Sequence, residues 1–184
     1  MTYIDETAKI GLNVEIGRDV IIGPYCVIGY PAEHPSEPYK FHGKVVIEDG
    51  ARLYKLVTVD APLTDDGVTI VGPGCVLMAH SHVGHDAQLG RRVTLATGAK
   101  IGGHSVIGDF SNIGLNAVTH QRTRLAPGTM LGAQSFIKGE HTDPFRIFVG
   151  SPARDIGLNV ILLQRLEHEG IFDYSHLLAG QPEQ

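Results

Sequence analysis

The sequence predicts an all-β chain wound as a parallel β-helix, with a short helical segment at the C-terminal end. From residue 71 to residue 137 an apolar side chain recurs at every sixth position, with Thr119 as the one exception, and a small or β-branched one stands four places after each of them. Glycine often occupies the position directly after the apolar one. A period of six differs from that of an α-helix and from that of a single half-buried strand. It fits a solenoid of very short strands, in which three hexapeptides complete one triangular coil.

Each hexapeptide has two inward-facing positions, one large and one small, which together are expected to fill a narrow prism. A sandwich of evenly spaced short strands gives no reason for so strict a period. The large positions are Val71, Leu77, Val83, Leu89, Leu95, Ile101, Ile107, Ile113, Thr119, Leu125, Leu131 and Ile137. The small positions are Cys75, Ser81, Ala87, Val93, Ala99, Ser105, Ser111, Ala117, Thr123, Thr129 and Ser135. The large set also opens the chain at Ile4, Ile10, Ile16, Ile22 and Ile28, and resumes at Ile47, Leu53 and Val59.

Two polar stretches interrupt the repeat, at residues 30–44 and 60–67, and both are expected to leave the prism as loops because proline and polar residues cannot continue the strands. The hexapeptides stop after Gly139. We therefore predict a β-helix over residues 1–140 and a C-terminal extension over residues 141–184. In the extension, LNVILLQRLEHE (158–169) has the pattern of an amphipathic helix with Val160, Leu163 and Leu166 on one face, and FDYSHLLAG (172–180) is expected to form a short second helix.

The composition narrows the possible partners. The 184 residues carry a net charge of −5 without a long Lys/Arg run, which argues against nucleic acid and favours small molecules or proteins. No apolar run approaches the ~18 residues of a membrane span, and the N-terminal MTYIDETAK lacks the character of a signal peptide. We expect no membrane span and a cytoplasmic location. Cys26 and Cys75 occupy small inward positions, so buried thiols are expected rather than a disulfide or metal ligands.

The candidate chemistry lies in histidines that occupy outward positions of the repeat: His80, His82, His85, His104 and His120. A residue 18 places further on returns to the same face one coil later, ~4.8 Å away if coils pair like strands. Asp86 and His104 are 18 apart, and His85 stands beside Asp86. The sequence thus predicts a His/Asp/His cluster on one edge of the prism. An imidazole beside a carboxylate suits a general base, because its unperturbed pKa of about 6.5 lies close to neutral pH.

Three segments carry a resemblance to a known family: HSHVGHDAQLG (80–90), KIGGHSVIGDF (100–110) and His120-Gln121. They are similar to segments of the left-handed β-helix acyltransferases, and in particular of the UDP-N-acetylglucosamine O-acyltransferase family of lipid A biosynthesis. The resemblance implies a left-handed coil and a homotrimer with active sites between subunits. It also implies no bound cofactor, an acyl carrier protein or coenzyme A thioester as co-substrate, and a hydroxyl or amine of a sugar or nucleotide sugar as the acceptor.

The same resemblance assigns roles to individual residues. It implies that His85 is the general base, that Asp86 steadies it, and that the Gly103 backbone N–H faces the developing oxyanion. No metal is implied. The substrate-binding residues that it implies are Lys40, His82, His104, His120 and Gln121 for the sugar and acyl part, Ala133 for acyl-chain length, and Asn159 and Arg165 for the nucleotide.

The chain also departs from the family, since Asp60 replaces a histidine, Ile161 replaces an acidic residue and the C-terminal helical part is shorter. Alternatives therefore stay open. VGSPAR (149–154) resembles a turn of acetyl-CoA-dependent acetyltransferases of small molecules. The γ-class carbonic anhydrases share the fold and bind zinc with three histidines, for which His80, His85 and the loop residue His42 are the candidates. A catalytically silent scaffold is a third alternative. The acceptor, O- versus N-acylation, acyl length and the carrier are not settled by the sequence.

Overall fold

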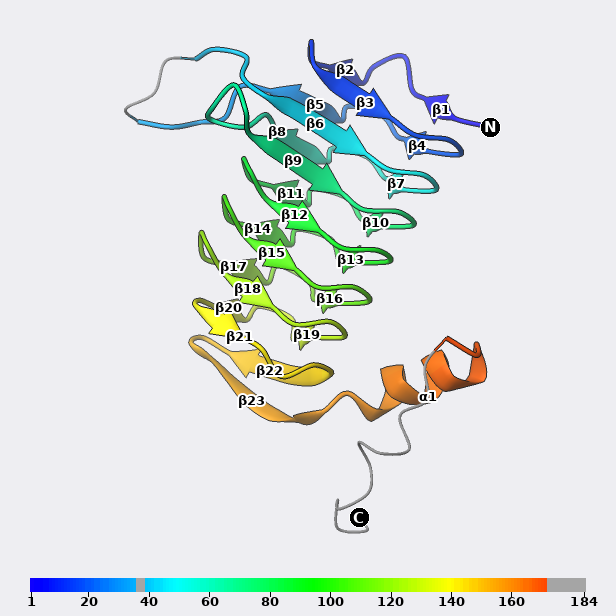
Figure 1. Ribbon diagram of the computed structural model, residues 1–184, viewed down its shortest axis with the longest axis vertical. Helices are drawn as coiled ribbons and strands as arrows, with labels where there is room; N and C mark the ends of the chain where they lie inside the picture. Colours follow the sequence, from blue (N-terminus) through cyan, green and yellow to red (C-terminus); the bar gives the residue numbers. More distant parts are fainter. Residues whose placement is uncertain (36–38, 172–184) are drawn as a thin grey trace.

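The computed structural model describes residues 1–35 and 39–171 and shows a left-handed parallel β-helix (Figure 1). Three parallel sheets form the faces of a triangular prism, and the chain visits face 1, face 2 and face 3 in turn on every coil. The predicted fold class is confirmed. The edges where the chain passes between faces are named edge 1–2, edge 2–3 and edge 3–1.

The strands are mostly two residues long. Face 1 contains β1 (Tyr3–Ile4), β4 (Ile21–Ile22), β7 (Arg52–Leu53), β10 (Val76–Leu77), β13 (Thr94–Leu95), β16 (Asn112–Ile113), β19 (Met130–Leu131), β22 (Arg146–Gly150) and β23 (Ala153–Leu158). Face 2 contains β2 (Lys9–Ile10), β5 (Val27–Tyr30), β8 (Thr58–Asp60), β11 (His82–Val83), β14 (Lys100–Ile101), β17 (Val118–Thr119) and β20 (Phe136–Ile137). Face 3 contains β3 (Val14–Ile16), β6 (Lys44–Ile47), β9 (Val68–Val71), β12 (Gln88–Leu89), β15 (Val106–Ile107), β18 (Arg124–Leu125) and β21 (Glu140–His141).

The core follows the predicted pattern. Every large and every small inward position between residues 71 and 137 is buried, and equivalent positions stack directly, as in the pairs Leu77 with Leu95 and Leu95 with Ile113. The first coil differs, because Ile4 is 42% exposed. Its strand β1 pairs with β4 alone, so one side of the coil has no neighbour to cover it.

Glycine in the second position of a hexapeptide permits close contact between coils. A Cβ on Gly102 would lie 2.5 Å from the backbone nitrogen of Gln121 in the next coil, and one on Gly114 would lie 2.7 Å from that of Ala133. The left-handed backbone conformation of the turn falls two places later, in many turns on a non-glycine residue such as Asp86 (φ 59°) and in others on a glycine such as Gly98 (φ 75°). A side chain would therefore be a hindrance at these glycines, whereas the sharp turn belongs to another position.

Both loops leave the prism at edge 2–3, the first between β5 and β6 and the second between β8 and β9. The winding continues beyond residue 140, because β21 pairs with β18 and β22 pairs with β19 before the antiparallel strand β23 closes the last coil. The boundary predicted at residue 140 therefore falls within the last coil. Backbone pairing needs no hexapeptide pattern, and Phe148 fills the last core position in place of an aliphatic residue.

The extension contains the predicted helix, α1 (Val160–His168). The Asn159 side chain caps it by accepting a hydrogen bond from the Leu162 N–H (3.3 Å). Leu162, Leu163 and Leu166 are buried against two aromatic residues of edge 3–1, so Leu162 completes the face on which Val160 was expected. The second predicted helix (172–180) lies outside the described residues. In the part of the chain that the structure describes, no helix is long and apolar enough to cross a membrane.

Candidate active site

Edge 2–3 collects most of the candidate residues from three successive turns. The turn after β11 carries His85 and Asp86, the turn after β14 carries Gly103 and His104, and the turn after β17 carries His120 and Gln121. Because pairing partners in these coils are 18 residues apart, positions distant in sequence become vertical neighbours. Stacking alone therefore assembles the site.

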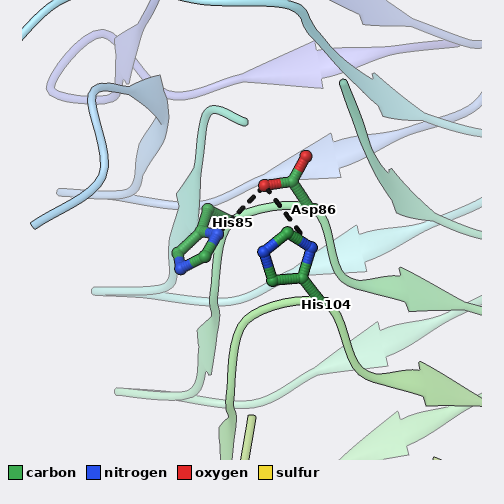
Figure 2. A group of neighbouring side chains, drawn as sticks. All are labelled: His85, Asp86 and His104. Atoms are coloured by element: carbon green, nitrogen blue, oxygen red, sulfur yellow. Dashed lines mark hydrogen bonds and ion pairs between the residues drawn. The ribbon is translucent and has the colours of Figure 1, made fainter. Parts of the chain in front are cut away.

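The predicted His/Asp/His cluster is present. Both imidazoles point toward the Asp86 carboxylate (Figure 2), with His85 Nδ1 3.0 Å and His104 Nδ1 3.9 Å from Oδ2. The two rings meet edge to face with centroids 4.9 Å apart. If His85 donates its Nδ1–H to the carboxylate, its Nε2 keeps a lone pair that can accept a proton. The arrangement is that of an oriented base.

Two contacts outside the predicted set hold Asp86 in place. Its backbone N–H donates to the hydroxyl of the buried Thr69 (2.8 Å), and its Oδ2 accepts a hydrogen bond from the Leu63 N–H of the second loop (3.2 Å). Neither contact could be inferred from motifs, because Thr69 occupies an inward position and Leu63 acts through its backbone.

Gly103 lies directly against His85. A Cβ on Gly103 would be 2.5 Å from His85 Nε2, so the imidazole occupies the space that a side chain would need. The neighbouring His104 N–H donates to the His85 carbonyl (2.9 Å) and the Arg122 N–H donates to the Gly103 carbonyl (2.8 Å). Within residues 1–35 and 39–171 the Gly103 N–H itself has no hydrogen-bond acceptor. It is available to a ligand.

A cleft of about 640 Å³ lies over face 2 and is lined by residues of β5, β8, β11 and β14, the last two of which precede the turns that carry the cluster. His82 lies in this cleft with its Nδ1 2.8 Å from the Thr58 hydroxyl and its Nε2 3.8 Å from Asp60 Oδ2. Burial lowers the pKa of His82. Burial and, as the smaller cause, the negative charge of Glu33 together raise the pKa of Asp60 to about 7. The lining includes Tyr30, Glu33, Thr58, Asp60, His82 and Lys100.

The first loop contributes residues that the sequence did not indicate. The His34 ring packs edge to face against His85, with centroids 6.3 Å apart. Glu33 contributes a charge to the environment of both Asp60 and His82. The only sequence signal for these two residues was their position in a loop that interrupts the repeat.

His104, His120 and Gln121 extend the edge toward solvent. Partial burial lowers the pKa of His104. The negative charge of the nearby Asp86 acts on this pKa in the opposite direction. His120 packs against Phe136 with ring centroids 6.1 Å apart, and its Nδ1 lies 3.2 Å from the Gln121 carbonyl oxygen. These side chains are exposed along the same line as His85.

Four of the predicted residues lie elsewhere. Lys40 is in the first loop, where its charge helps to lower the pKa of Asp65. Ala133 is exposed at edge 1–2, between β19 and β20. Asn159 is buried beside edge 3–1, where its amide donates to the Gly128 carbonyl (3.2 Å), and Arg165 is on the exposed side of α1. A single chain does not bring Ala133, Asn159 and Arg165 to the edge that carries His85.

The zinc-site alternative finds no support in the geometry. His80 is in the turn between β10 and β11 at edge 1–2, whereas His85 is at edge 2–3. The third candidate, His42, is paired with Asp65 (2.6 Å). The three histidines therefore do not converge. The VGSPAR segment forms the β22–β23 hairpin at the end of the prism.

Comparison with known proteins agrees with this arrangement. Residues 68–103 match the bacterial transferase hexapeptide family (six repeats). The acyl-(acyl-carrier-protein)–UDP-N-acetylglucosamine O-acyltransferase of Thermodesulfovibrio yellowstonii is 35% identical, over 90% of this chain and 78% of the relative. The chain belongs to this O-acyltransferase family. The Burkholderia orbicola member is 33% identical over 82% of the chain, which spans 57% of that relative's length.

Solved structures of the O-acyltransferase family share the fold. The UDP-N-acetylglucosamine acyltransferase from Campylobacter jejuni superposes with a TM-score of 0.78 at 24% identity, over 96% of this chain and 78% of the other. The structure from Bacteroides fragilis gives a TM-score of 0.76 at 25% identity, over 100% of this chain and 73% of the other. The chain is an acyltransferase, and these findings do not favour the acetyl-CoA-dependent or carbonic anhydrase alternatives.

Proposed function

We propose that the chain transfers an acyl group from acyl carrier protein to a hydroxyl of UDP-N-acetylglucosamine. The observation that carries the proposal is the His85–Asp86 pair (3.0 Å) with the glycine amide of the next coil beside it. An oriented base and a free N–H donor are the two elements that acyl transfer to a hydroxyl requires. The relatives, which are acyl-(acyl-carrier-protein)–UDP-N-acetylglucosamine O-acyltransferases by name, indicate the donor and the acceptor.

Each group then has one task. His85 Nε2 takes the proton of the acceptor hydroxyl while its Nδ1–H stays bonded to Asp86. The hydroxyl oxygen attacks the thioester carbonyl carbon, and the Gly103 N–H donates to the resulting oxyanion, a type of contact that contributes about 3–4 kcal/mol when preorganised. As the intermediate collapses, the C–S bond breaks and the imidazolium returns the proton to the leaving sulfur. The products are the ester and the free carrier thiol.

The assignments of the substrate-binding side chains follow from their positions on face 2 and along edge 2–3. His82 and His104 flank His85 on the same and the next coil, so we assign them to the acceptor sugar. His120 and Gln121 lie one coil further and suit the acyl part. Lys40 of the first loop supplies a cation near the same edge for the anionic donor or nucleotide.

We also propose a homotrimer with one active site at each subunit contact. Arg165 and Ala133 are exposed away from edge 2–3 of their own chain, so a neighbouring copy has to present them, and the buried Asn159 caps the helix on which Arg165 lies. Face 1 carries the exposed apolar side chains Ile21 and Met78 that such a contact could cover. Light scattering should give three chains of 19.8 kDa, whereas a monomer at micromolar concentration would overturn the shared site. The cytoplasmic location stays a prediction.

The decisive experiment replaces the base. His85→Ala should lower kcat by roughly 10²–10⁴-fold with acyl carrier protein thioester and UDP-N-acetylglucosamine, the usual contribution of a positioned base. Asp86→Asn should cost less, because the carboxylate only orients the ring. Asn116→Gly, at an exposed turn of edge 1–2 with the same left-handed backbone (φ 52°), is the matched control and should keep its activity. Full activity in a folded His85→Ala protein would falsify the assignment.

The same assay decides the substrates. Acyl-CoA donors and amino-sugar acceptors are run in parallel with the proposed pair. A higher kcat/KM with acyl-CoA would replace acyl carrier protein as the proposed donor, and a higher kcat/KM with an amino sugar would replace the proposed hydroxyl acceptor. Either result leaves the role of His85 intact.

A further inference from the structure

The cluster at edge 2–3 also has the composition of a metal site. The two imidazoles and the carboxylate each offer one ligand atom, and these atoms all lie within 4.8 Å of one another. Two neutral nitrogens and one anionic oxygen form a donor set that Zn²⁺ accepts readily. We propose that His85, Asp86 and His104 bind one Zn²⁺ per chain reversibly, and that the bound ion inhibits acyl transfer. The inhibitory half rests on the proposed function, whereas the binding half does not.

The geometry needs little adjustment. Tetrahedral Zn²⁺ with bonds of about 2.0–2.1 Å places neighbouring ligand atoms about 3.3 Å apart. His85 Nδ1 and Asp86 Oδ2 are already 3.0 Å apart, and His104 Nδ1 is 3.9 Å from the same oxygen. The two imidazole nitrogens, which lie within 4.8 Å of each other, also have to close to this separation, and the movement falls to His104, whose Nδ1 has to approach the carboxylate oxygen by about 0.6 Å. Its side chain is 38% exposed and can rotate, while the other two are largely enclosed.

The existing contacts preorganise the ligands. The backbone of Asp86 is fixed by Thr69 and its carboxylate by the Leu63 N–H (3.2 Å), so the anionic ligand does not need to be ordered on binding. Hydrogen bonds to a ligating carboxylate are a common support of metal sites. Three protein ligands leave a fourth position for water.

The inhibition follows from the tautomer of His85. In the catalytic arrangement Nδ1 carries the proton and Nε2 carries the lone pair. A metal ion on Nδ1 requires the lone pair at that nitrogen, so the single proton of the neutral ring moves to Nε2. Nε2 can then no longer accept a proton from the acceptor. Because the ion sits on the Asp86 side of the ring, it disables the base without occupying the space of the acceptor hydroxyl.

Binding is measured without reference to activity. Chelator-treated trimer is titrated with Co²⁺, whose visible absorption reports tetrahedral coordination, and then with Zn²⁺, which should displace it at one ion per chain. Asp86→Asn and His104→Ala should each weaken binding by more than the ~10–100-fold that outer-sphere partners contribute. His42→Ala, which removes the other His–carboxylate pair at 2.6 Å, is the control and should leave the stoichiometry at one. No tetrahedral absorption, or unchanged affinity in Asp86→Asn, would overturn the site.

Inhibition is measured on the same preparations. Activity should fall in proportion to Zn²⁺ occupancy and return on chelation, with kcat reduced. A protein that binds one Zn²⁺ and keeps full kcat would overturn the inhibitory half and leave the metal site standing. Failure of the proposed function shows separately, as full activity of metal-free His85→Ala.

Discussion

The turns at edge 1–2 and edge 2–3 share a backbone conformation, with φ of 60° at His80 and 59° at Asp86 in the same position of the hexapeptide. Their surroundings differ. His80 is exposed, whereas the Asp86 side chain is only 13% exposed and contacts two histidines. The repeat therefore determines where a side chain points, and the neighbours above and below it determine what it can do.

The loops account for the difference between the two edges. Both leave the prism at edge 2–3, where the second loop donates the Leu63 N–H to Asp86 and the first places His34 against His85. Edge 1–2 passes directly from one strand to the next in every described coil. A histidine gains an enclosed, hydrogen-bonded environment only where the repeat is interrupted beside it.

The variant with the largest expected effect in this comparison is Gly103→Ala. At edge 1–2 the equivalent position holds Thr97, Leu115 and Ala133, so the backbone accepts side chains there. At Gly103 the new Cβ would displace the His85 ring, and a displacement of about 1 Å can cost ~10²-fold in rate. We expect kcat to fall by roughly that factor with unchanged thermal unfolding, and Thr97→Ala to behave as wild type. Normal kcat in Gly103→Ala would mean that the ring has room that the structure does not show.

A smaller effect concerns the free energy of unfolding, which the buried Asp60 in the cleft on face 2 makes dependent on pH. Burial raises the pKa of Asp60 to about 7, above its unfolded value of about 3.9, so the folded state favours the protonated acid. The stabilising contribution of protonated Asp60 to the free energy of unfolding is fully present below about pH 4 and is lost as the pH rises toward 7. Asp60→Asn should therefore be more stable than wild type at pH 8, by on the order of 2 kcal/mol, with the difference disappearing near pH 4.

Urea unfolding at pH 4, 5.5 and 8 measures this difference. The exposed Asp66→Asn is the control and should stay within about 0.5 kcal/mol of wild type at each pH. A constant difference for Asp60→Asn across the range would show that the carboxyl does not titrate as expected.

The smallest expected effect tests whether edge 1–2 has a role of its own. If a neighbouring subunit uses Ala133 to limit the acyl chain, Ala133→Gly should favour longer donors and Ala133→Met shorter ones. Each buried methylene is worth ~0.8 kcal/mol, which corresponds to about a fourfold change in relative kcat/KM. The measurement is kcat/KM across donors from acetyl to long 3-hydroxyacyl thioesters. An unchanged profile in both variants would confine the chemistry to edge 2–3.

The sequence was sufficient to predict the coil and the stacked cluster because both depend on one period. Once Leu77 and Leu95 are known to stack, Asp86 and His104 must stack as well. The winding of residues 140–150 was missed, since β21 and β22 pair through their backbones after the side-chain pattern has ended. Likewise, Leu162 replaced Val160 on the buried face of α1 because Phe110 and Phe145 determine that contact.

The parts of the site that the sequence could not provide depend on the loops. His34, Glu33 and Leu63 lie in segments without periodicity, so no rule of register could place them near His85. The Thr58 hydroxyl beside His82 is on a regular strand, but an outward threonine has no distinguishing signal. The raised pKa of Asp60 results from burial under the first loop and from Glu33, which also required the folded chain.

The 18-residue coil sets a rule for insertions and deletions. Six residues added between Asp86 and His104 within the winding would carry His104 to a different edge and separate the two side chains completely. Eighteen residues would restore the edge but insert a whole coil between them. Segments extruded as loops escape this rule, because the coils still pair where the loops begin, as the Ala61 N–H bonded to the Tyr30 carbonyl (2.8 Å) illustrates for the starts of the two loops. Length variation in a protein built this way should therefore concentrate in the loops or change by whole coils beyond the catalytic ones.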